Sequence, residues 1–187
     1  MEQPADRVPA PGRLALVQEF VNSADLEEGT DQLADVATAA GWLRRHHPDA
    51  RHRLEEDQRR RLIDVRESLR SVLHVHNGEA VDQPASARLD GLLAGVRLRP
   101  AVTAGGGALI PVGEGVDGLL AVLTSAIVEA TIAGTWERLK VCRDDECRWA
   151  FYDHSKNARG AWCTMRVCGN RAKARAYRER QRATARR

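Results

Sequence analysis

The stretch CRDDECRWAFYDHSKNARGAWCTMRVC, residues 142–168, decides how the C-terminal part of the chain folds. It contains all four cysteines, as two pairs with four residues inside each pair and fifteen between the pairs. Two such pairs, brought together by a loop, supply the four soft thiolates that a structural zinc ion prefers. The chain starts without an apolar export leader, so its thiols are expected to stay reduced. We therefore predict one Zn²⁺ bound by Cys142, Cys147, Cys163 and Cys168.

The residues alone leave three alternatives for these thiols: disulfides, an iron–sulfur cluster or uncoordinated core cysteines. His154 lies between the two pairs and could replace one thiolate, but four cysteines fill a tetrahedral shell without it. Large apolar side chains are scarce here and are limited to a small aromatic group, Trp149, Phe151, Tyr152 and Trp162. A bound metal would therefore supply most of the stability of this region, typically about 10 kcal/mol or more.

A strongly basic helix is predicted directly after the last cysteine, over residues 169–182. Four of its arginines recur at positions i, i+4, i+7 and i+11, which places them in one stripe about 16 Å long. The guanidinium fork suits both phosphates and guanine edges. We therefore predict a nucleic-acid surface made of Arg171, Arg175, Arg178 and Arg182, with Asn170, Lys173 and Lys156 as further contacts.

The charge distribution supports this prediction. Residues 156–187 contain eleven Lys or Arg and one acid, so they carry +10, and the rest of the chain carries −7, which together give the net charge of +3. An acidic body with a basic tail is typical of a protein with a polyanionic partner. The alternative is a basic helix end that is only solvated.

The N-terminal two thirds of the chain predict a helical domain. Apolar residues recur at helical spacing over residues 13–22, 31–46, 54–76, 85–94 and 117–133, and Thr30 is expected to cap the second helix. Two short runs, 96–103 and 108–112, flank Gly105–Gly107 and predict a β-hairpin, and residues 136–139 predict a last turn. We therefore predict a mainly α fold with a small β-hairpin, divided into a disordered leader (1–12), a helical domain (13–139) and a zinc module (140–187) with a separate core.

The sequence also argues against several classes of protein. The 187 residues contain no run of eighteen apolar residues, so no ordinary transmembrane helix or membrane partner is expected, and we expect a cytoplasmic protein. No nucleophile elbow, zinc-protease motif or catalytic cysteine is present, so we do not expect an enzyme. His74 and His76 would point about 200° apart on a helix and cannot chelate together. His46 and His47 suit a helix C-terminus.

The C-terminal motifs resemble those of a known family. Asp153-x-Ser155-Lys156-Asn157, Trp162-Cys163 and Cys168-Gly169-Asn170-Arg171 are similar to the CGNR zinc finger, although Thr164 replaces the usual serine. Residues 13–140 resemble the ABATE domain that usually precedes this finger, through Leu14–Asn22 and Leu98-Arg99-Pro100. Where the family has Asp before Phe-Val-Asn, this chain has Glu19, which takes the place of that acid or alters a ligand site there.

The resemblance implies a regulator of transcription in a stress response. Its finger would bind DNA, and its helical domain would sense a small ligand or mediate homodimerisation. Two alternatives remain open. The first is a zinc protein associated with RNA or the ribosome, for which Tyr177 and Trp162 are the aromatics placed to stack on bases. The second is an enzyme with a pocket in the helical domain and a purely structural zinc.

Overall fold

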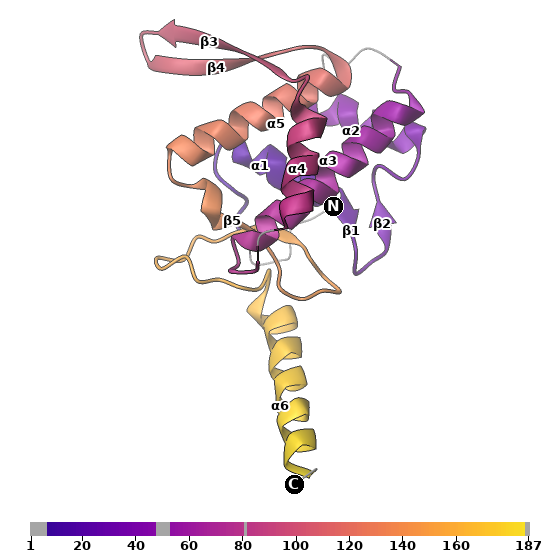
Figure 1. Ribbon diagram of the computed structural model, residues 1–187, viewed down its shortest axis with the longest axis vertical. Coiled ribbons are helices and arrows are strands. Elements are labelled where there is room, and N and C mark those ends of the chain that lie inside the picture. The colour runs from indigo at the N-terminus through magenta and orange to yellow at the C-terminus, as the bar shows by residue number, and fades with distance from the viewer. Residues whose placement is uncertain (1–6, 48–52, 81, 186–187) are drawn as a thin grey trace.

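The computed structural model describes residues 7–47, 53–80 and 82–185, and the chain is mostly helical with three small antiparallel strand pairs (Figure 1). The helices are α1 Leu14–Val21, α2 Val36–His46, α3 Glu56–Val75, α4 Gln83–Leu93, α5 Gly115–Ile132 and α6 Asn170–Ala185. The strand pairs are β1 Ala24–Asp25 with β2 Thr30–Asp31, β3 Arg97–Thr103 with β4 Gly106–Val112, and β5 Leu139–Val141 with β6 Ala150–Tyr152. The mainly α fold with a β-hairpin is thus confirmed.

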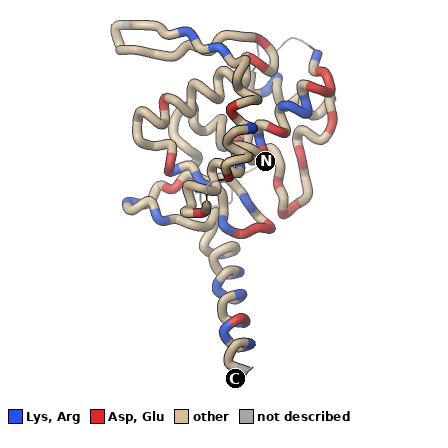
Figure 2. Tube along the Cα trace, viewed as in Figure 1, with Lys and Arg blue, Asp and Glu red and all other residues tan. Residues whose placement is uncertain are grey.

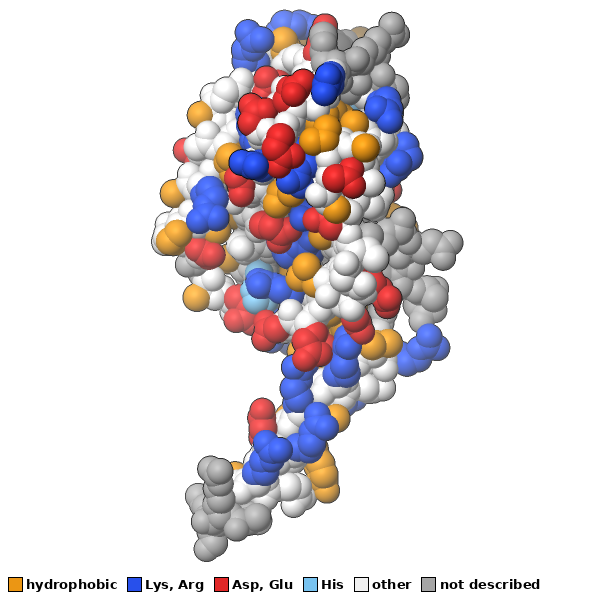
Figure 3. Space-filling view, turned by 90° about the vertical axis from the view of Figure 1, so that its right-hand side faces the viewer, with side chains coloured by type: hydrophobic (Ala, Val, Ile, Leu, Met, Phe, Trp, Pro, Cys, Tyr) orange, Lys and Arg blue, Asp and Glu red, His pale blue; other side chains and the backbone are white. Residues whose placement is uncertain are grey.

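Helix α6 stands apart from the rest of the described chain. Helices α1–α5 form one body, the β3–β4 hairpin lies at its far end, and α6 projects from the opposite end (Figure 1). Lys and Arg recur along α6, as the charge-coloured trace shows (Figure 2). In space-filling view, several basic side chains lie along the visible face of α6 with one acidic side chain among them, and acidic side chains gather where α6 meets the body (Figure 3).

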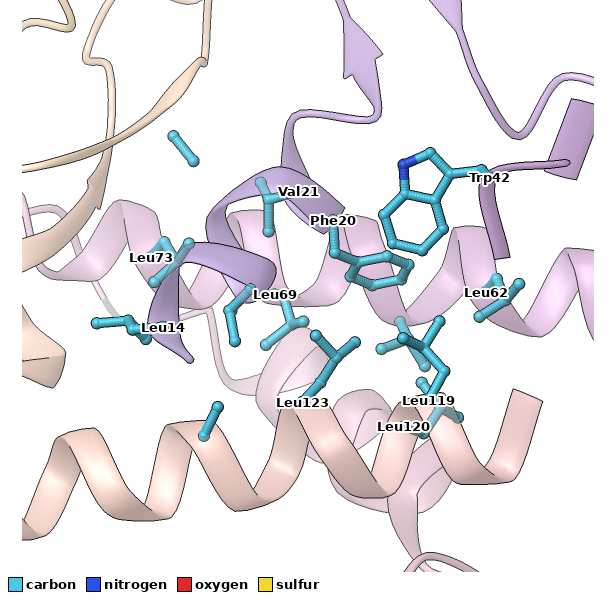
Figure 4. Packing of buried hydrophobic residues seen from close by; sticks show 14 of the residues in the cluster. Leu14, Phe20, Val21, Trp42, Leu62, Leu69, Leu73, Leu119, Leu120 and Leu123 are labelled. Carbon is cyan, nitrogen blue, oxygen red and sulfur yellow. The ribbon is translucent and has the colours of Figure 1, made fainter. Parts of the chain in front are cut away.

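The core of the body lies between α1, α2, α3 and α5. Phe20 and Trp42 are fully buried with ring centroids 5.5 Å apart, and Leu62, Leu69 and leucines of α5 pack beside them (Figure 4). This packing follows from the helical spacing of apolar residues, which gives each helix one apolar stripe. The most apolar run of the sequence becomes α5, as predicted, and supplies Leu119, Leu120 and Leu123 to the core.

Helix α5 is also the one helix in the described ranges that is long and apolar enough to cross a membrane. More than half of that stretch, 56%, is buried inside the fold. Its apolar residues therefore serve as the central packing surface of the helical body, which is how a core helix behaves.

Several predicted boundaries were wrong, and local capping explains them. Helix α2 begins at Val36 instead of Asp31, because the Asp35 side chain accepts a hydrogen bond from the Thr38 amide at 2.9 Å and forms a capping box. Thr30, the predicted cap, instead pairs with Asp25 in the β1–β2 ladder. In the hairpin, Gly106 and Gly107 belong to β4 and pair with β3, so the turn is tighter than predicted.

The β5–β6 pair was not predicted from the sequence, and it connects two clusters of buried residues. Leu139, Val141, Ala150 and Tyr152 pack with the helical core. Phe151, on the same strand as Ala150, packs instead with the four cysteines, Trp149 and Trp162. Successive residues of a strand point to opposite faces, so these two short strands contribute to both clusters.

Candidate zinc centre and nucleic-acid interface

The four cysteines converge on one point from three segments. Cys142 directly follows β5, Cys147 precedes β6, and Cys163 and Cys168 lie at the turn that leads into α6. A turn brings the first pair together: the Cys147 amide donates to the Asp144 carbonyl at 2.9 Å, and the Cys142 amide donates to the Trp149 carbonyl at 2.9 Å. All four thiols are buried.

The geometry of the sulfur atoms suits zinc. The four Sγ atoms lie within 4.8 Å of one another, and Cys163 Sγ lies 3.5 Å from both Cys147 Sγ and Cys168 Sγ. Tetrahedral Zn–S bonds of about 2.3 Å place sulfurs about 3.8 Å apart. Four soft donors in a buried, closed shell are the ligand set of a structural zinc site, so the predicted metal and ligands fit.

The four thiols strongly influence one another's protonation. Hydrogen bonds from Cys147 and Cys163 lower the pKa of the Cys142 thiol. Hydrogen bonds to Cys142 and Cys147, together with burial, raise the pKa of Cys163. A bound dication would stabilise all four sulfurs as thiolates.

Arg171 links the zinc centre to its surroundings. Its Nη2 donates to Cys168 Sγ at 3.2 Å, and its guanidinium forms two hydrogen bonds with the Glu27 carboxylate at 2.7 and 2.9 Å. Its Nε lies 2.9 Å from Asp144 Oδ2. Glu27 belongs to the turn between β1 and β2 of the helical domain, so one arginine joins a metal ligand, the zinc loop and that domain.

Arg175 is also paired within the chain. Its Nη2 donates to Asp144 Oδ1 at 2.6 Å, while the Asp144 side chain is fully buried. Asp144 thus holds the first two arginines of the predicted stripe against the zinc loop. Neither Asp144 nor Glu27 was predicted from the sequence. One signal for Asp144 was available in the sequence. It is an acid between Cys142 and Cys147, and the chain continues from this module into an arginine-rich helix with which an acid could pair.

The remaining predicted contacts lie further out. Lys173, Arg178 and Arg182 are exposed on α6. Asn170 is exposed at the start of α6, and its Nδ2 donates to the Arg166 carbonyl at 2.9 Å. Lys156 is exposed on the loop after β6. The structure therefore divides the predicted set into an inner pair, Arg171 and Arg175, and an outer group of exposed residues.

The loop that carries Lys156 is organised by a buried carboxylate. Asp153 accepts hydrogen bonds from Ser155 Oγ at 2.6 Å, from the Gly160 amide at 2.6 Å and from Lys140 Nζ at 3.2 Å. Burial alone would raise the pKa of Asp153, but these hydrogen bonds lower it to about 2. A Cβ at position 160 would lie 2.9 Å from Asp153 Oδ2, so a glycine is needed for this close approach.

Polar side chains of the helical domain bind the zinc module through its backbone. Asn22 pairs with both backbone groups of Ala150: its Nδ2 donates to the carbonyl at 2.8 Å, and its Oδ1 accepts from the amide at 2.7 Å. Asn77 Nδ2 donates to the carbonyls of Val141 at 2.7 Å and Ala161 at 3.0 Å. These buried contacts fix the module against the helices.

The described part of the predicted leader lies against the zinc module. Arg7 donates to the carbonyls of Cys163 at 2.6 Å and Trp162 at 2.7 Å, and its guanidinium lies 4.7 Å from the Phe151 ring centroid. Ala10 is buried in the helical core. Residues 1–6 lie outside the described residues.

None of the described histidines joins the cysteine cluster. His154 is exposed, and its Nε2 lies 3.2 Å from the carbonyls of Val8 and Pro9. His76, which follows the last residue of α3, has its Nδ1 2.7 Å from the Leu139 carbonyl.

Comparison with known families agrees with this architecture. Residues 12–135 match the model of a family described as "ABATE: Putative stress-induced transcription regulator". The chain belongs to the ABATE family. Residues 138–181 match the CGNR zinc finger, so the two domains occur in the predicted order. Neither family is a family of enzymes. A comparison with curated proteins finds no match.

Proposed function

We propose that this ABATE protein regulates transcription by binding duplex DNA through the outer part of α6. The observation that supports this proposal is the projection of a basic helix from a metal-organised base. The described helix carries six Lys or Arg and one Glu. The four clustered cysteines and the family of the chain support a zinc-binding regulator.

The outer group of α6 is suited to phosphate contacts. From Lys173 to Arg182 the helix rises about 14 Å. Lys173, Arg178 and Arg182 are all exposed over that length. Arg178 and Arg182 share one face of the helix and are proposed to bind phosphate oxygens or guanine edges, and Lys173, on the opposite face, is proposed as a further contact. Asn170 and Lys156 are exposed nearer the zinc module and are proposed as secondary contacts. We assign Arg171 and Arg175 to positioning of α6, because acidic groups already bind their guanidinium groups.

Acidic groups at the base of α6 restrict where DNA can lie. Glu28, Asp145 and Glu146 are all exposed in this part of the molecule. They would repel a phosphate backbone placed against the zinc module. The duplex is therefore expected to meet the helix toward its C-terminal end, where basic side chains predominate (Figure 2).

A salt titration tests this surface. In the double variant Arg178→Gln, Arg182→Gln, the log–log salt dependence of DNA binding should become shallower by about two units, because each phosphate contact contributes about 0.9. The matched control is Arg44→Gln, Arg88→Gln, which removes the same charge from exposed sites on α2 and α4. An unchanged slope in the α6 variant, or an equal change in the control, would contradict the proposal.

RNA is the second candidate partner, and one observation favours it. Tyr177 is 58% exposed on α6, where its ring could stack on an unpaired base. Trp162, the other aromatic considered, is half buried against the zinc cluster. Titration of the same protein with single-stranded and hairpin RNA decides between the two: a preference for RNA over every duplex tested would replace the DNA proposal.

We further propose that the helical domain senses a small ligand, in a cytoplasmic protein whose thiols stay reduced. Homodimerisation is the alternative role for this domain. Sedimentation of the zinc-loaded chain with and without DNA separates them, because a dimer would bind two half-sites together.

A further inference from the structure

A cavity of about 220 Å³ lies where α1 and α2 face the zinc module. Its lining includes Glu19 of α1, Gln32, Trp42, Arg45 and His46 of the α2 region, and Trp149 of the zinc module. The cavity is separate from the cysteine cluster and from the outer group of α6. It is large enough for a molecule of the size of an amino acid.

Two aromatic side chains give the cavity a rigid apolar part. Trp42 is 1% exposed and stacks on the His46 ring with centroids 4.2 Å apart and planes at 26°. Trp149 is 5% exposed. Asn22 also lines the cavity, but its amide is already bound to both backbone groups of Ala150, so it fixes the wall rather than recognising a ligand.

Glu19 forms the acidic side of the cavity and lies next to a histidine. Glu19 Oε2 lies 3.3 Å from His46 Nδ1, and the Glu19 side chain is half exposed. Burial lowers the pKa of His46 below its usual value, so the imidazole is mostly neutral near pH 7. The Glu19 carboxylate therefore faces an uncharged hydrogen-bonding partner and can still attract a cation.

Arg45 forms the basic side of the cavity, and its hydrogen-bonding partner is uncharged. Arg45 Nη2 donates to Gln32 Oε1 at 2.9 Å, and the amide oxygen is an uncharged acceptor. The guanidinium retains donors that can bind a carboxylate in a forked arrangement. Glu19 and Arg45 both border the same space, with His46 adjacent to Arg45 in the chain.

From this arrangement we propose that the cavity binds a small zwitterion of the free amino-acid class. Its ammonium group would lie at Glu19, its carboxylate at Arg45, and its apolar part near Trp42 and Trp149. The inference rests on the proposed sensing role and names the ligand class. A molecule there would contact both domains, since Trp149 lies two residues after the zinc ligand Cys147.

Binding is tested on the zinc-loaded full chain with the twenty L-amino acids, each added separately in a thermal-shift assay and confirmed by calorimetry. At least one with an apolar side chain should raise the melting temperature and bind with a measurable Kd. Two analogues of that amino acid, the amine that lacks its carboxylate and the carboxylic acid that lacks its ammonium group, should each bind at least tenfold more weakly. If no amino acid binds, or a single-charge analogue binds equally well, the proposal is overturned.

Two substitutions test the assigned contacts. Glu19→Gln and Arg45→Gln should each weaken amino-acid binding at least tenfold, whereas the controls Glu55→Gln and Arg44→Gln, at exposed sites outside the cavity, should leave it unchanged. Circular dichroism checks that each variant is folded. Unchanged binding in either cavity variant would overturn the proposal. DNA binding is titrated without amino acids, so failure of the cavity proposal and failure of the DNA proposal are distinguishable.

Discussion

The helical domain and the zinc module are stabilised in different ways. The helical domain buries a continuous cluster of leucines, valines and aromatics from α1, α2, α3 and α5. The zinc module buries four thiols, two aromatics and a carboxylate paired with a lysine. The first obtains its stability from removal of apolar surface from water, and the second from metal binding and buried ion pairs such as that of Lys140 with Asp153.

The two domains are therefore sensitive to different kinds of substitution. Loss of packing should affect the helical domain most, and loss of a ligand or a buried charge should affect the zinc module most. The β5–β6 pair connects the two, because Leu139 and Ala150 pack with the helices while Phe151 packs with the cysteines. Four substitutions separate these sensitivities, in order of decreasing effect.

Cys168→Ser should have the largest effect. It removes one of four ligands, and structural zinc typically supplies about 10 kcal/mol or more to such a module. We expect the metal content to fall from one Zn²⁺ per chain toward zero and the module to unfold, while far-UV circular dichroism still reports the helices of the body. Elemental analysis and chelator titration measure this. One tightly bound zinc in the variant would contradict the four-cysteine site.

Leu123→Asp should destabilise the helical domain by about 5 kcal/mol. Leu123 is 2% exposed in the middle of the core, so the variant creates a cavity and buries an unpaired carboxylate. The matched control is Leu26→Asp, at a site that is 44% exposed, which should change the free energy of unfolding by less than about 0.5 kcal/mol. Chemical denaturation measures both. Similar losses in the two variants would show that the core is misplaced.

Asp153→Asn should cost about 3 kcal/mol at pH 7, because it leaves the buried Lys140 ammonium without its carboxylate. The pKa of Asp153 is lowered from 3.8 to about 2, so this contribution is present above about pH 4 and is lost as the pH falls toward 2. The difference in the free energy of unfolding between the parent and the variant should therefore become smaller as the pH falls from about 4 toward 2. Asp145→Asn, at an exposed site of the same module, is the control and should show no such convergence.

Arg171→Gln should have the smallest effect, seen in metal affinity. It removes the donor to Cys168 Sγ, and such outer contacts are typically worth about tenfold in affinity. Arg178→Gln, on the exposed part of the same helix, should leave zinc affinity unchanged and alter DNA binding instead. Competition with a zinc chelator measures the first property and a DNA titration the second. The reverse pattern would contradict the division of α6 into inner and outer parts.

Features with a local cause were predictable from the sequence. The cysteine spacing predicted the ligand set, the long apolar stripes predicted α3 and α5, and Gly105–Gly107 predicted the hairpin. The β5–β6 pair was not predictable, because three-residue strands carry too few residues for a periodic pattern and depend on their tertiary partners. The pairing of Arg171 and Arg175 with Asp144 was missed for the same reason: a helical stripe shows which side chains share a face and not what that face meets. The predicted domain boundaries stay a prediction.

Helix α6 is attached to the rest of the molecule at one end only within the described residues, so a small change in its angle moves its far end. Its sixteen residues span about 24 Å, and Asp144 holds it near its first turns through Arg171 and Arg175. A tilt of α6 by about 10° around its contacts with Asp144 would move the far end of the helix by about 4 Å, slightly more than the spacing of successive base pairs in DNA. A shift of the zinc loop against the helical body is therefore larger at the far end of α6, and in the proposed DNA complex it would change which base pair that end meets.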